Sequence, residues 1–364
     1  MKNISAKVKK IKKSGLRKLF ELAQKMDKPL DLSLGAPDLD IPAAIKRALI
    51  KNINQFQKAY STNQGDAKVR EKITVKLKAQ NAIPARADEI LITSGTTAAL
   101  WISLSTLINP GDEVIIFDPY FVLYKSMIEL AGGVPVVVST YPNWELPINT
   151  LKNKINSKTK AIILNNPGNP TGKVYDRESL KQLAAIAARY KVWVIADEIY
   201  EELVYEKRHT SIGSLYKRSI SIMGPAKAAS LSGYRIAYLH APKDLVSEMI
   251  KVQQLQYVCA PVPAQAALAV SLNLDYQNIR RHYHRKLKLV NKILGFSPGM
   301  DGAFYAFIPS GRKDCNSIIR KLRKKKVLVT PGNLFSQRNT HFRISYSLSS
   351  VKLIKALKII KQNL

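Results

Sequence analysis

The sequence predicts an α/β fold in which a mostly parallel sheet is covered by helices on its faces. Short apolar runs that are bounded by turn residues alternate with amphipathic stretches, and this alternation is typical of parallel α/β proteins. The apolar runs that suggest strands buried on both faces lie at residues 114–117, 161–164, 192–195 and 220–223. The stretch at 177–188 has the spacing of an amphipathic helix. We therefore expect the polar residues that follow these strands to meet at one edge of the sheet, where such folds bind ligands.

The pattern changes near residue 275. A long basic helix is expected there, and the segments after it alternate between short strands and helices. The expected strands lie at residues 302–308, 327–330 and 342–346. This order is typical of an α+β unit. We therefore predict a large domain at 45–274 and a smaller α+β domain made of residues 1–44 and 275–364.

Length and composition suit a two-domain protein without a membrane segment. The chain has 364 residues, of which 46% are hydrophobic, enough for a large and a smaller core. No apolar run reaches the roughly 18 residues that a membrane-spanning helix needs, and the basic start leads into no apolar signal core. Cys259 and Cys315 lack the spacing of a metal or disulfide motif, so we expect free thiols, no metal site and a cytoplasmic location.

The charge of the chain is strongly positive. Lysine and arginine number 58 against 26 aspartates and glutamates, a formal net charge of +32. Basic residues cluster at 7–13, 280–288 and 320–326. Such clusters suit a polyanion-binding face, but here lysines alternate with Leu, Ile and Val at helical spacing, which favours solvated helix faces. No signature of a nucleic-acid-binding fold accompanies the clusters, so a nucleic-acid partner is not expected.

Five polar residues of different chemistry follow the predicted strands: Asn169, Asp197, Tyr200, Lys227 and Arg235. Pyridoxal 5′-phosphate (PLP) needs such a set. A lysine amine holds it as a Schiff base, a carboxylate keeps its ring nitrogen protonated, and a phenol and an amide bind its ring oxygen. The guanidinium offers a two-pronged donor to the phosphate. An ordinary lysine is protonated at pH 7, so Lys227 has to be activated by desolvation or by a neighbouring cation.

Each of these residues also has a purely structural explanation. Asp197 at a strand end is often a helix cap, and Asn169 before a proline is often a turn residue. Lys227 is one of very many lysines, and an arginine before an apolar run, such as Arg235, is usually a surface charge. The occurrence of the whole set in one order favours the cofactor.

These residues belong to motifs that resemble those of the class I/II aminotransferases, the fold-type I PLP enzymes related to aspartate and aromatic aminotransferases. The resemblance extends over almost the whole chain. Its motifs lie at residues 14–17, 32–38, 60–71, 93–100, 118–121, 165–172, 196–202, 223–238, 302–305 and 342–346. The resemblance implies a mostly parallel seven-stranded sheet flanked by helices, with a smaller α+β domain beside it.

The resemblance also implies a role for individual residues around PLP. Lys227 forms the internal aldimine and then moves a proton between the substrate Cα and the cofactor, while Asp197 and Tyr200 act on the ring. Phe121 stacks on the ring, and Tyr60 reaches the phosphate of a second subunit. The other implied cofactor-binding residues are Gly95, Thr96, Thr97, Asn169 and Arg235.

The implied substrates are an L-amino acid, such as aspartate or an aromatic amino acid, and a 2-oxo acid such as 2-oxoglutarate. Arg343 binds the substrate α-carboxylate, with help from Asn169 and from a backbone amide near Gly35. The amino group is transferred in a ping-pong cycle through the aldimine of Lys227. The implied assembly is a homodimer whose subunits share their active sites.

Two positions depart from the family pattern. Gly224-Pro-Ala precedes Lys227 where the family usually has Ser-x-Ser, so one hydroxyl donor to the phosphate is missing. Thr97 stands where some aspartate-specific relatives carry a lysine, which weakens an assignment to aspartate. Two alternatives stay open. One is a β-eliminating C–S lyase on the same fold, because Lys227 and Arg343 would serve both reactions. The other is a weakly catalytic PLP-fold protein that binds polyanions, as the Gly-Pro-Ala segment and the charge of +32 suggest.

Overall fold

The computed structural model describes residues 4–5, 8–9, 11, 15–54, 59–295 and 300–364 of the chain. The motif at 14–17 and the basic cluster at 7–13 therefore lie partly outside the described residues. Within the described ranges, no helix is long and apolar enough to cross a lipid bilayer.

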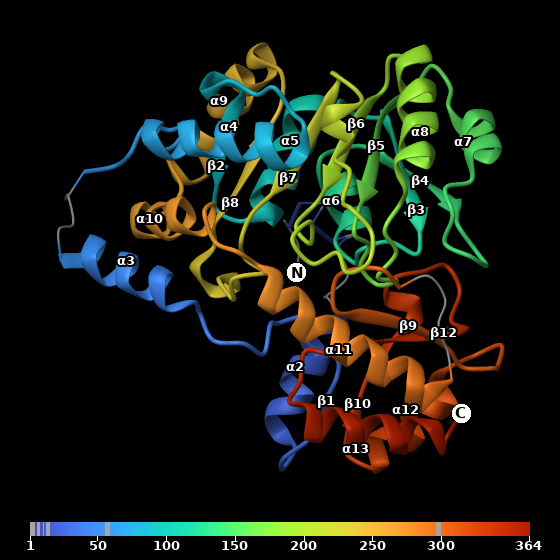
Figure 1. Cartoon of the computed structure of the whole chain (residues 1–364). Coiled ribbons are helices and arrows are strands. Elements are labelled where there is room, and N and C mark those ends of the chain that lie inside the picture. Colours follow the sequence, from blue (N-terminus) through green and yellow to red (C-terminus); the bar gives the residue numbers. More distant parts are fainter. Residues whose placement is uncertain (1–3, 6–7, 10, 12–14, 55–58, 296–299) are drawn as a thin grey trace.

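A seven-stranded sheet forms the centre of the larger part of the molecule (Figure 1). Its strand order is β2-β8-β7-β6-β5-β3-β4. β8 is antiparallel to both of its neighbours and the other pairs are parallel, which confirms the predicted mostly parallel α/β sheet. The strands are β2 (Ile90–Thr93), β3 (Glu113–Asp118), β4 (Val134–Ser139), β5 (Thr159–Asn165), β6 (Trp193–Asp197), β7 (Ser219–Met223) and β8 (Ala237–His240).

Helices cover both faces of this sheet, so consecutive strand residues are buried in different clusters. Ile116 and Ile163 pack with side chains of α5, α6 and α9, whereas Ile115 and Ile162 pack with side chains of α7 and α8. Burial on both faces explains why these strands are continuous apolar runs in the sequence. The helices of this part are α4 (Ala67–Asn81), α5 (Thr96–Leu107), α6 (Tyr124–Leu130), α7 (Ile148–Lys154), α8 (Arg177–Arg189), α9 (Lys243–Tyr257) and α10 (Val262–Ser271).

The smaller part contains a three-stranded antiparallel sheet of order β11-β12-β9 and a short parallel pair, β1 with β10. Its strands are β1 (Leu30–Asp31), β9 (Tyr305–Pro309), β10 (Val327–Leu328), β11 (Thr330–Pro331) and β12 (His341–Ser345). Its helices are α2 (Gly15–Lys25), α11 (Gln277–Leu294), α12 (Asn316–Lys324) and α13 (Ser350–Lys361). The short 3-10 helices among the described residues are η1 (Ala87–Glu89), η2 (Ile212–Ser214), η3 (Ser232–Tyr234) and η4 (Gly332–Leu334). The β1–β10 pairing brings the N-terminal segment to the C-terminal part.

Helix α3 (Ala43–Asn54) lies outside both compact parts in Figure 1 and packs against α10. It begins close to the predicted boundary at residue 45. The domain division at 45 and 275 stays a prediction.

Two predicted strands differ from the observed ones. The strand expected at 327–330 is divided between β10 and β11, which pair with β1 and β12 respectively. The strand expected at 302–308 begins only at Tyr305, because the preceding residues turn toward the larger part. In this turn the Gly302 amide donates to the Gly172 carbonyl, and Ala303 has a φ of 57°.

The carboxyl ends of β5, β6 and β7 lie side by side and place the polar residues that follow them. Asn165 at the end of β5 is in register with Asp197 at the end of β6. Asp197 is in turn in register with Ile222 of β7, five residues before Lys227. Neighbouring strands thus direct their following loops to one edge of the sheet, as expected for this class of fold.

Candidate active site

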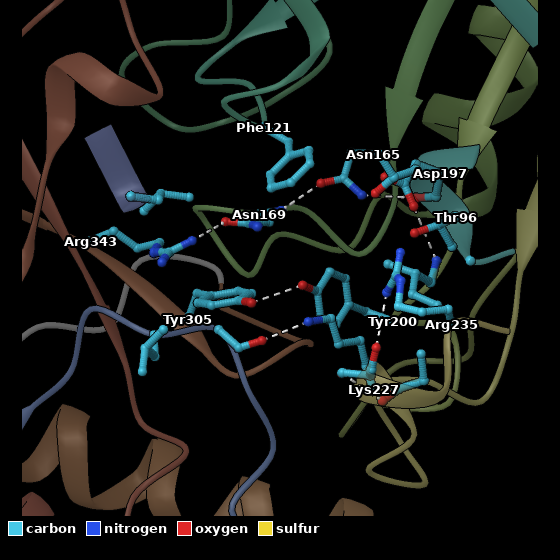
Figure 2. Close-up of a pocket in the computed structure, with 18 of the residues that line it drawn as sticks. Thr96, Phe121, Asn165, Asn169, Asp197, Tyr200, Lys227, Arg235, Tyr305 and Arg343 are labelled. Carbon is cyan, nitrogen blue, oxygen red and sulfur yellow. Dashed lines mark hydrogen bonds between the residues drawn. The ribbon is translucent and has the colours of Figure 1, made fainter. Parts of the chain in front are cut away.

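A cavity of about 230 Å³ lies where this edge of the sheet meets the smaller part (Figure 2). Its wall contains every predicted site residue except Tyr60: Gly35, Gly95, Thr96, Thr97, Phe121, Asn169, Asp197, Tyr200, Lys227, Arg235 and Arg343. Arg343 and Arg235 lie at opposite ends of the group, with Tyr200 between them. The Tyr60 residue is 81% exposed and lies outside the cavity wall.

Lys227 follows β7 and is held with its amine inside the cavity. Its Nζ donates a 2.6 Å hydrogen bond to the carbonyl of Gly35. Burial lowers the pKa of Lys227 to about 8, and the positive charges of Arg343 and Arg235 add to this effect, while Asp197 opposes it. With such a pKa, roughly a tenth of the amine is unprotonated at pH 7. The activation that the chemistry requires is therefore supplied by desolvation first and by neighbouring cations second.

Asp197 ends β6 and points into the same cavity. Its Oδ2 accepts a 2.7 Å hydrogen bond from the hydroxyl of Tyr124, whereas its Oδ1 has only a long contact of 3.5 Å from the amide of Ile199. Burial raises the pKa of Asp197, and the hydrogen bond from Tyr124 acts in the opposite direction. One carboxylate oxygen is thus anchored by the protein, and the other is open to a donor in the cavity.

The side-chain amide of Asn165 hydrogen-bonds both to β6, which carries Asp197, and to the loop after β5. Asn165 donates from Nδ2 to the carbonyl of Asp197 over 2.9 Å, and its Oδ1 accepts the amide of Asn169 over 2.7 Å. The side chain of Asn169 is left to contact Arg343, whose Nη1 donates to Asn169 Oδ1 over 2.9 Å. These bonds place an amide group between the sheet edge and the smaller part.

The start of α5 and Arg235 form a pocket that suits an anion. Gly95 caps the helix with a φ of 87°, and the amides of Thr96 and Thr97 lie in its first turn, where backbone N–H groups have no helical carbonyl to bind. A Cβ at Gly95 would lie 2.6 Å from Arg235 Nη2, so glycine is needed for the guanidinium to approach. Arg235 itself has a left-handed backbone, with φ 54° and ψ 58°. A non-glycine residue in this region is strained, and such strain often marks a functional site.

Arg343 extends from β12 into the opposite end of the cavity and is almost completely buried. Its Nη2 donates to the Ser33 carbonyl over 2.6 Å. Its guanidinium lies between the rings of Tyr305 and Phe335, at 4.5 and 4.6 Å from their centres. The Nε atom is buried without a hydrogen-bond partner among the described residues. A buried guanidinium with an unpaired donor is suited to a planar carboxylate.

A family model for class I and II aminotransferases matches residues 27–360. The chain belongs to this family. It is 36% identical over 373 residues to a probable aspartate aminotransferase of Methanocaldococcus jannaschii, a match that covers 99% of each chain. It is 33% identical to aromatic-amino-acid aminotransferase 2 of Thermococcus litoralis, over 99% of this chain and 98% of the relative. The solved structure of Thermus thermophilus aspartate aminotransferase with maleate superimposes with a TM-score of 0.96 at 30% identity, over the full length of both chains. The predicted family and fold are thereby confirmed.

Several residues of this aminotransferase site were not predicted from the sequence. Tyr124 anchors Asp197, although only its position three residues after Phe121 hinted at a role. Tyr305 lay in a recognised motif without an assigned function, and its hydroxyl lies 2.9 Å from that of Tyr200. The remaining wall residues are Leu16, Ser33, Leu34, Asn165, Ile199, Ala226 and Ser232. No group of three or more His, Cys, Asp or Glu side chains in the described ranges is arranged to hold a metal ion.

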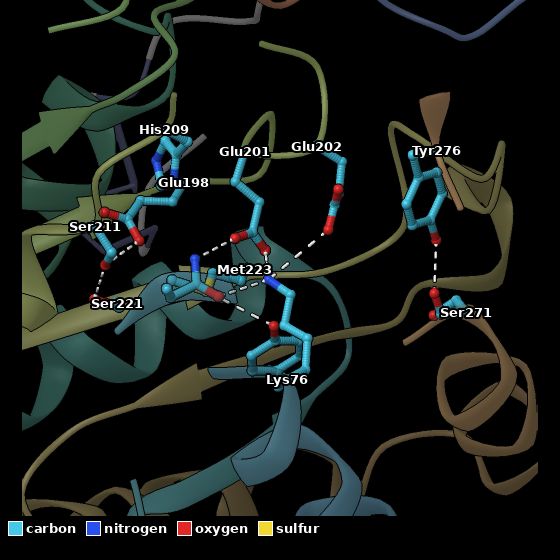
Figure 3. A network of polar contacts seen from close by, with 12 residues as sticks. Lys76, Glu198, Glu201, Glu202, His209, Ser211, Ser221, Met223, Ser271 and Tyr276 are labelled. Atoms are coloured by element: carbon cyan, nitrogen blue, oxygen red, sulfur yellow. Dashed lines mark hydrogen bonds and ion pairs between the residues drawn. The ribbon is translucent and has the colours of Figure 1, made fainter. Parts of the chain in front are cut away.

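A second polar network joins α4 to the residues that follow β6 (Figure 3). Lys76 donates from Nζ to Glu201 over 2.5 Å and to Asn81 over 2.9 Å. Glu202 accepts from Arg280 of α11 over 2.9 Å, which links the larger part to the smaller one. Lys76, Glu201 and Glu202 border a small cavity whose wall also contains Gly224 and Pro225. The segment that leads to Lys227 therefore shares a cavity wall with a buried ionic cluster.

Proposed function

We propose that this chain is a PLP-dependent aminotransferase that moves the amino group of an L-amino acid to a 2-oxo acid in a ping-pong cycle. The observation that carries the proposal is the position of Lys227, whose buried amine has a pKa of about 8. It shares one cavity with a carboxylate, Asp197, and with two guanidinium groups, Arg235 and Arg343. An activated amine between a ring-binding carboxylate and two anion sites is the arrangement that transamination needs.

The residues present fit PLP. The open Oδ1 of Asp197 can accept the proton of the ring nitrogen, and the helix start with Arg235 can hold the phosphate. Phe121 supplies an aromatic face in the cavity wall, and Tyr200 and Asn169 supply groups for the ring oxygen. Bound PLP would supply an electron sink for the bonds at the substrate Cα. The missing hydroxyl at position 224 leaves the phosphate to the amides of α5, to the two threonine hydroxyls there and to the guanidinium.

The substrate is held by the end of the cavity that belongs to the smaller part. Arg343 presents an unpaired buried Nε and is the proposed partner of the α-carboxylate. Asn169 and the backbone near Gly35 border the same space. The Lys227 amine contacts the carbonyl of Gly35, which borders this substrate space. Its proposed task there is to move a proton to and from the substrate Cα.

The relatives support both acidic and aromatic substrates, since they are described as aspartate and as aromatic-amino-acid aminotransferases. The cations of the cavity wall formed by the described residues are Lys227, Arg235 and Arg343, and each already has a proposed task. The amino donor and the acceptor are therefore proposed only as an L-amino acid and a 2-oxo acid, with aspartate, aromatic amino acids and 2-oxoglutarate as the first candidates.

The proposed active unit is a homodimer in which Tyr60 enters the phosphate site of the other subunit. The exposure of Tyr60 supports this proposal, as does the presence of other exposed apolar residues nearby in sequence, Ile50 and Ile53, on α3. A closed two-fold dimer would cover such a surface on both copies. Sedimentation of the active enzyme tests this point, and a fully active monomer contradicts it. The cytoplasmic location stays a prediction.

A panel of amino donors against 2-oxoglutarate tests the proposed reaction. Enzyme loaded with PLP is mixed with each donor alone, and the absorbance of the bound cofactor is recorded. Conversion to the pyridoxamine form, reversed by 2-oxoglutarate, is the expected result. Release of pyruvate and ammonia without that form would indicate β-elimination instead. A purified protein that never develops a visible cofactor band with added PLP would contradict both.

A further inference from the structure

Tyr305 lies between two groups that the proposed reaction uses. Its hydroxyl is 2.9 Å from the hydroxyl of Tyr200, which belongs to the larger part. Its ring centre lies 4.5 Å from the guanidinium carbon of Arg343. The two residues lie on the adjacent antiparallel strands β9 and β12, where Tyr305 pairs with Ser345. Figure 2 shows this order, with Tyr305 between Arg343 and Tyr200. One side chain therefore contacts both the proposed carboxylate site and the proposed ring site.

The backbone around Tyr305 is shaped to admit its hydroxyl. A Cβ at Gly35 would overlap the Tyr305 hydroxyl, so glycine is needed at this position. The carbonyl of the same Gly35 accepts the hydrogen bond from Lys227. The hydroxyl of Tyr305 is thus seated against the segment that also contacts the reactive amine.

The hydrogen bond between the hydroxyls of Tyr200 and Tyr305 is buried, and neither hydroxyl has another hydrogen-bond partner in the part of the chain that the structure describes. Among the described residues, Tyr305 is the only hydrogen-bond partner of the Tyr200 hydroxyl. Burial raises the pKa of both phenols, so both keep their protons over the working pH range, although the charge of Arg343 acts in the opposite direction on both. A cation on the face of a phenol ring draws electron density from it and makes its O–H a stronger donor. The hydrogen bond between the two hydroxyls can have either of them as its donor, and the contact of Arg343 with the Tyr305 ring favours Tyr305, which leaves the Tyr200 proton for a ligand.

We propose that Tyr305 is a positioning residue that couples the guanidinium of Arg343 to the ring-binding hydroxyl of Tyr200. This inference rests on the proposed function. With Arg343 unoccupied, Tyr305 donates strongly and Tyr200 becomes a stronger donor to the ring oxygen of the cofactor. A substrate carboxylate on Arg343 offsets its charge, weakens the donation by Tyr305 and so weakens the donation by Tyr200. Binding at one end of the cavity is thereby transmitted to the other.

The test measures the pH midpoint at which the visible absorbance of the bound cofactor changes. Wild type, Tyr305→Phe and the control Tyr205→Phe are compared, each loaded with PLP. Tyr205 belongs to another buried pair of phenols, 3.3 Å from Tyr346, and is not part of the cavity wall. A stronger donor to the ring oxygen disfavours protonation nearby, so loss of Tyr305 should raise the midpoint by about 0.5 pH unit or more. Tyr205→Phe should keep the midpoint of wild type.

A second readout uses carboxylates that lack an amino group, maleate and 3-phenylpropionate. Each protein is saturated with whichever of these two carboxylates binds to it. Saturation should raise the pH midpoint of the absorbance change in wild type and in Tyr205→Phe. In Tyr305→Phe this shift should fall to about half or less, because only the direct effect of the offset charge and the contact of Arg343 with Asn169 remain. A Tyr305→Phe enzyme with the midpoint and ligand shift of wild type overturns the coupling. The proposed function fails separately, if wild type forms no visible cofactor band.

Gly35→Ala gives an independent route to the same answer. Its new methyl group displaces the Tyr305 hydroxyl without removing it. The variant should raise the midpoint as Tyr305→Phe does, and the double variant should raise it no further. Additive shifts in the double variant would contradict the proposal. If Tyr305→Phe fails to fold, Gly35→Ala alone is compared with wild type, and an unchanged midpoint would contradict the proposal.

Discussion

The hydroxyl of Tyr124 donates a 2.7 Å hydrogen bond to Oδ2 of Asp197, so a residue of α6 holds the carboxylate at the end of β6. Tyr124→Phe should free this oxygen and remove an interaction that keeps Asp197 ionised against the effect of burial. Loss of a hydrogen bond to a charged group should weaken PLP binding by roughly 10-fold or more. Titration of the apoenzyme with PLP measures the effect. Tyr120→Phe, one turn earlier in the chain, is the matched control and should bind PLP as wild type does.

Lys227 should control both the attachment of PLP and its pH dependence. Attachment requires the neutral amine, so the rate of reconstitution should rise with pH up to about 8 and level off above it. Lys227→Ala should give no adduct that borohydride can trap. The same pKa shift affects the free energy of unfolding. Between pH 8 and pH 10.5, about the pKa values of Lys227 in the folded and unfolded chain, the unfolded chain binds more protons. The contribution of Lys227 to stability therefore rises with pH over this range. A trapped adduct in Lys227→Ala would place the anchor on another lysine.

Arg343→Lys should impair the use of all amino donors and leave PLP binding almost unchanged. Lysine keeps the charge but loses the planar fork and its stacking between two aromatic rings. The KM should rise by about 100-fold, the equivalent of roughly two charge-assisted hydrogen bonds. Arg338→Lys is a suitable control, because Arg338 stacks on Tyr141 and lies outside the cavity wall. Loss of PLP from Arg343→Lys would instead indicate a role in holding the cofactor.

We expect that Gly224→Ser does not restore the missing hydroxyl donor to the phosphate. A Cβ at Gly224 would lie 3.0 Å from the Cα and 3.2 Å from the Cβ of Ala237 in β8, so Gly224→Ser crowds the β7–β8 pair. We expect a loss of about 1–3 kcal/mol in the free energy of unfolding and no gain in PLP affinity. Adding Ala237→Gly removes one of the two contacts and should recover part of the stability. Tighter PLP binding at unchanged thermal stability would show that the backbone accommodates the hydroxyl.

The buried ion pair between Lys76 and Glu201 should matter for stability more than for chemistry. Lys76→Met leaves Glu201 buried without its cation, and removal of one partner of such a pair costs about 3–5 kcal/mol. Denaturant unfolding of the apoenzyme measures the loss. The double variant Lys76→Met with Glu201→Gln no longer leaves the Glu201 charge unpaired and should recover most of the lost stability, because Glu202 keeps its partner Arg280. A Lys76→Met protein as stable as wild type would contradict this prediction. It would mean that none of the groups that contact Lys76, which include Glu202 and Asn81, depends on its charge for stability.

The fold could be predicted where local pattern and burial agree. β3, β5, β6 and β7 are buried on both faces, so each is a continuous apolar run. β4 was not predicted from the apolar runs in the sequence. It is an edge strand that contains Pro135 and has partly exposed side chains, so it does not form a continuous apolar run. β8 was not predicted either, because four residues carry too little periodicity to reveal an antiparallel partner.

The sequence by itself determined which chemical groups follow which strands. The order of Asn169, Asp197, Lys227 and Arg235 is local information, since each lies a few residues beyond a predicted strand or motif. Only the tertiary structure decided which of these groups meet. Arg343 reaches Asn169 across 174 residues of chain, and Tyr305 reaches Tyr200 across 105. Such contacts arise where the loops that follow β5 and β6 meet the sheet of the smaller part, and residue spacing along the chain carries no signal for them.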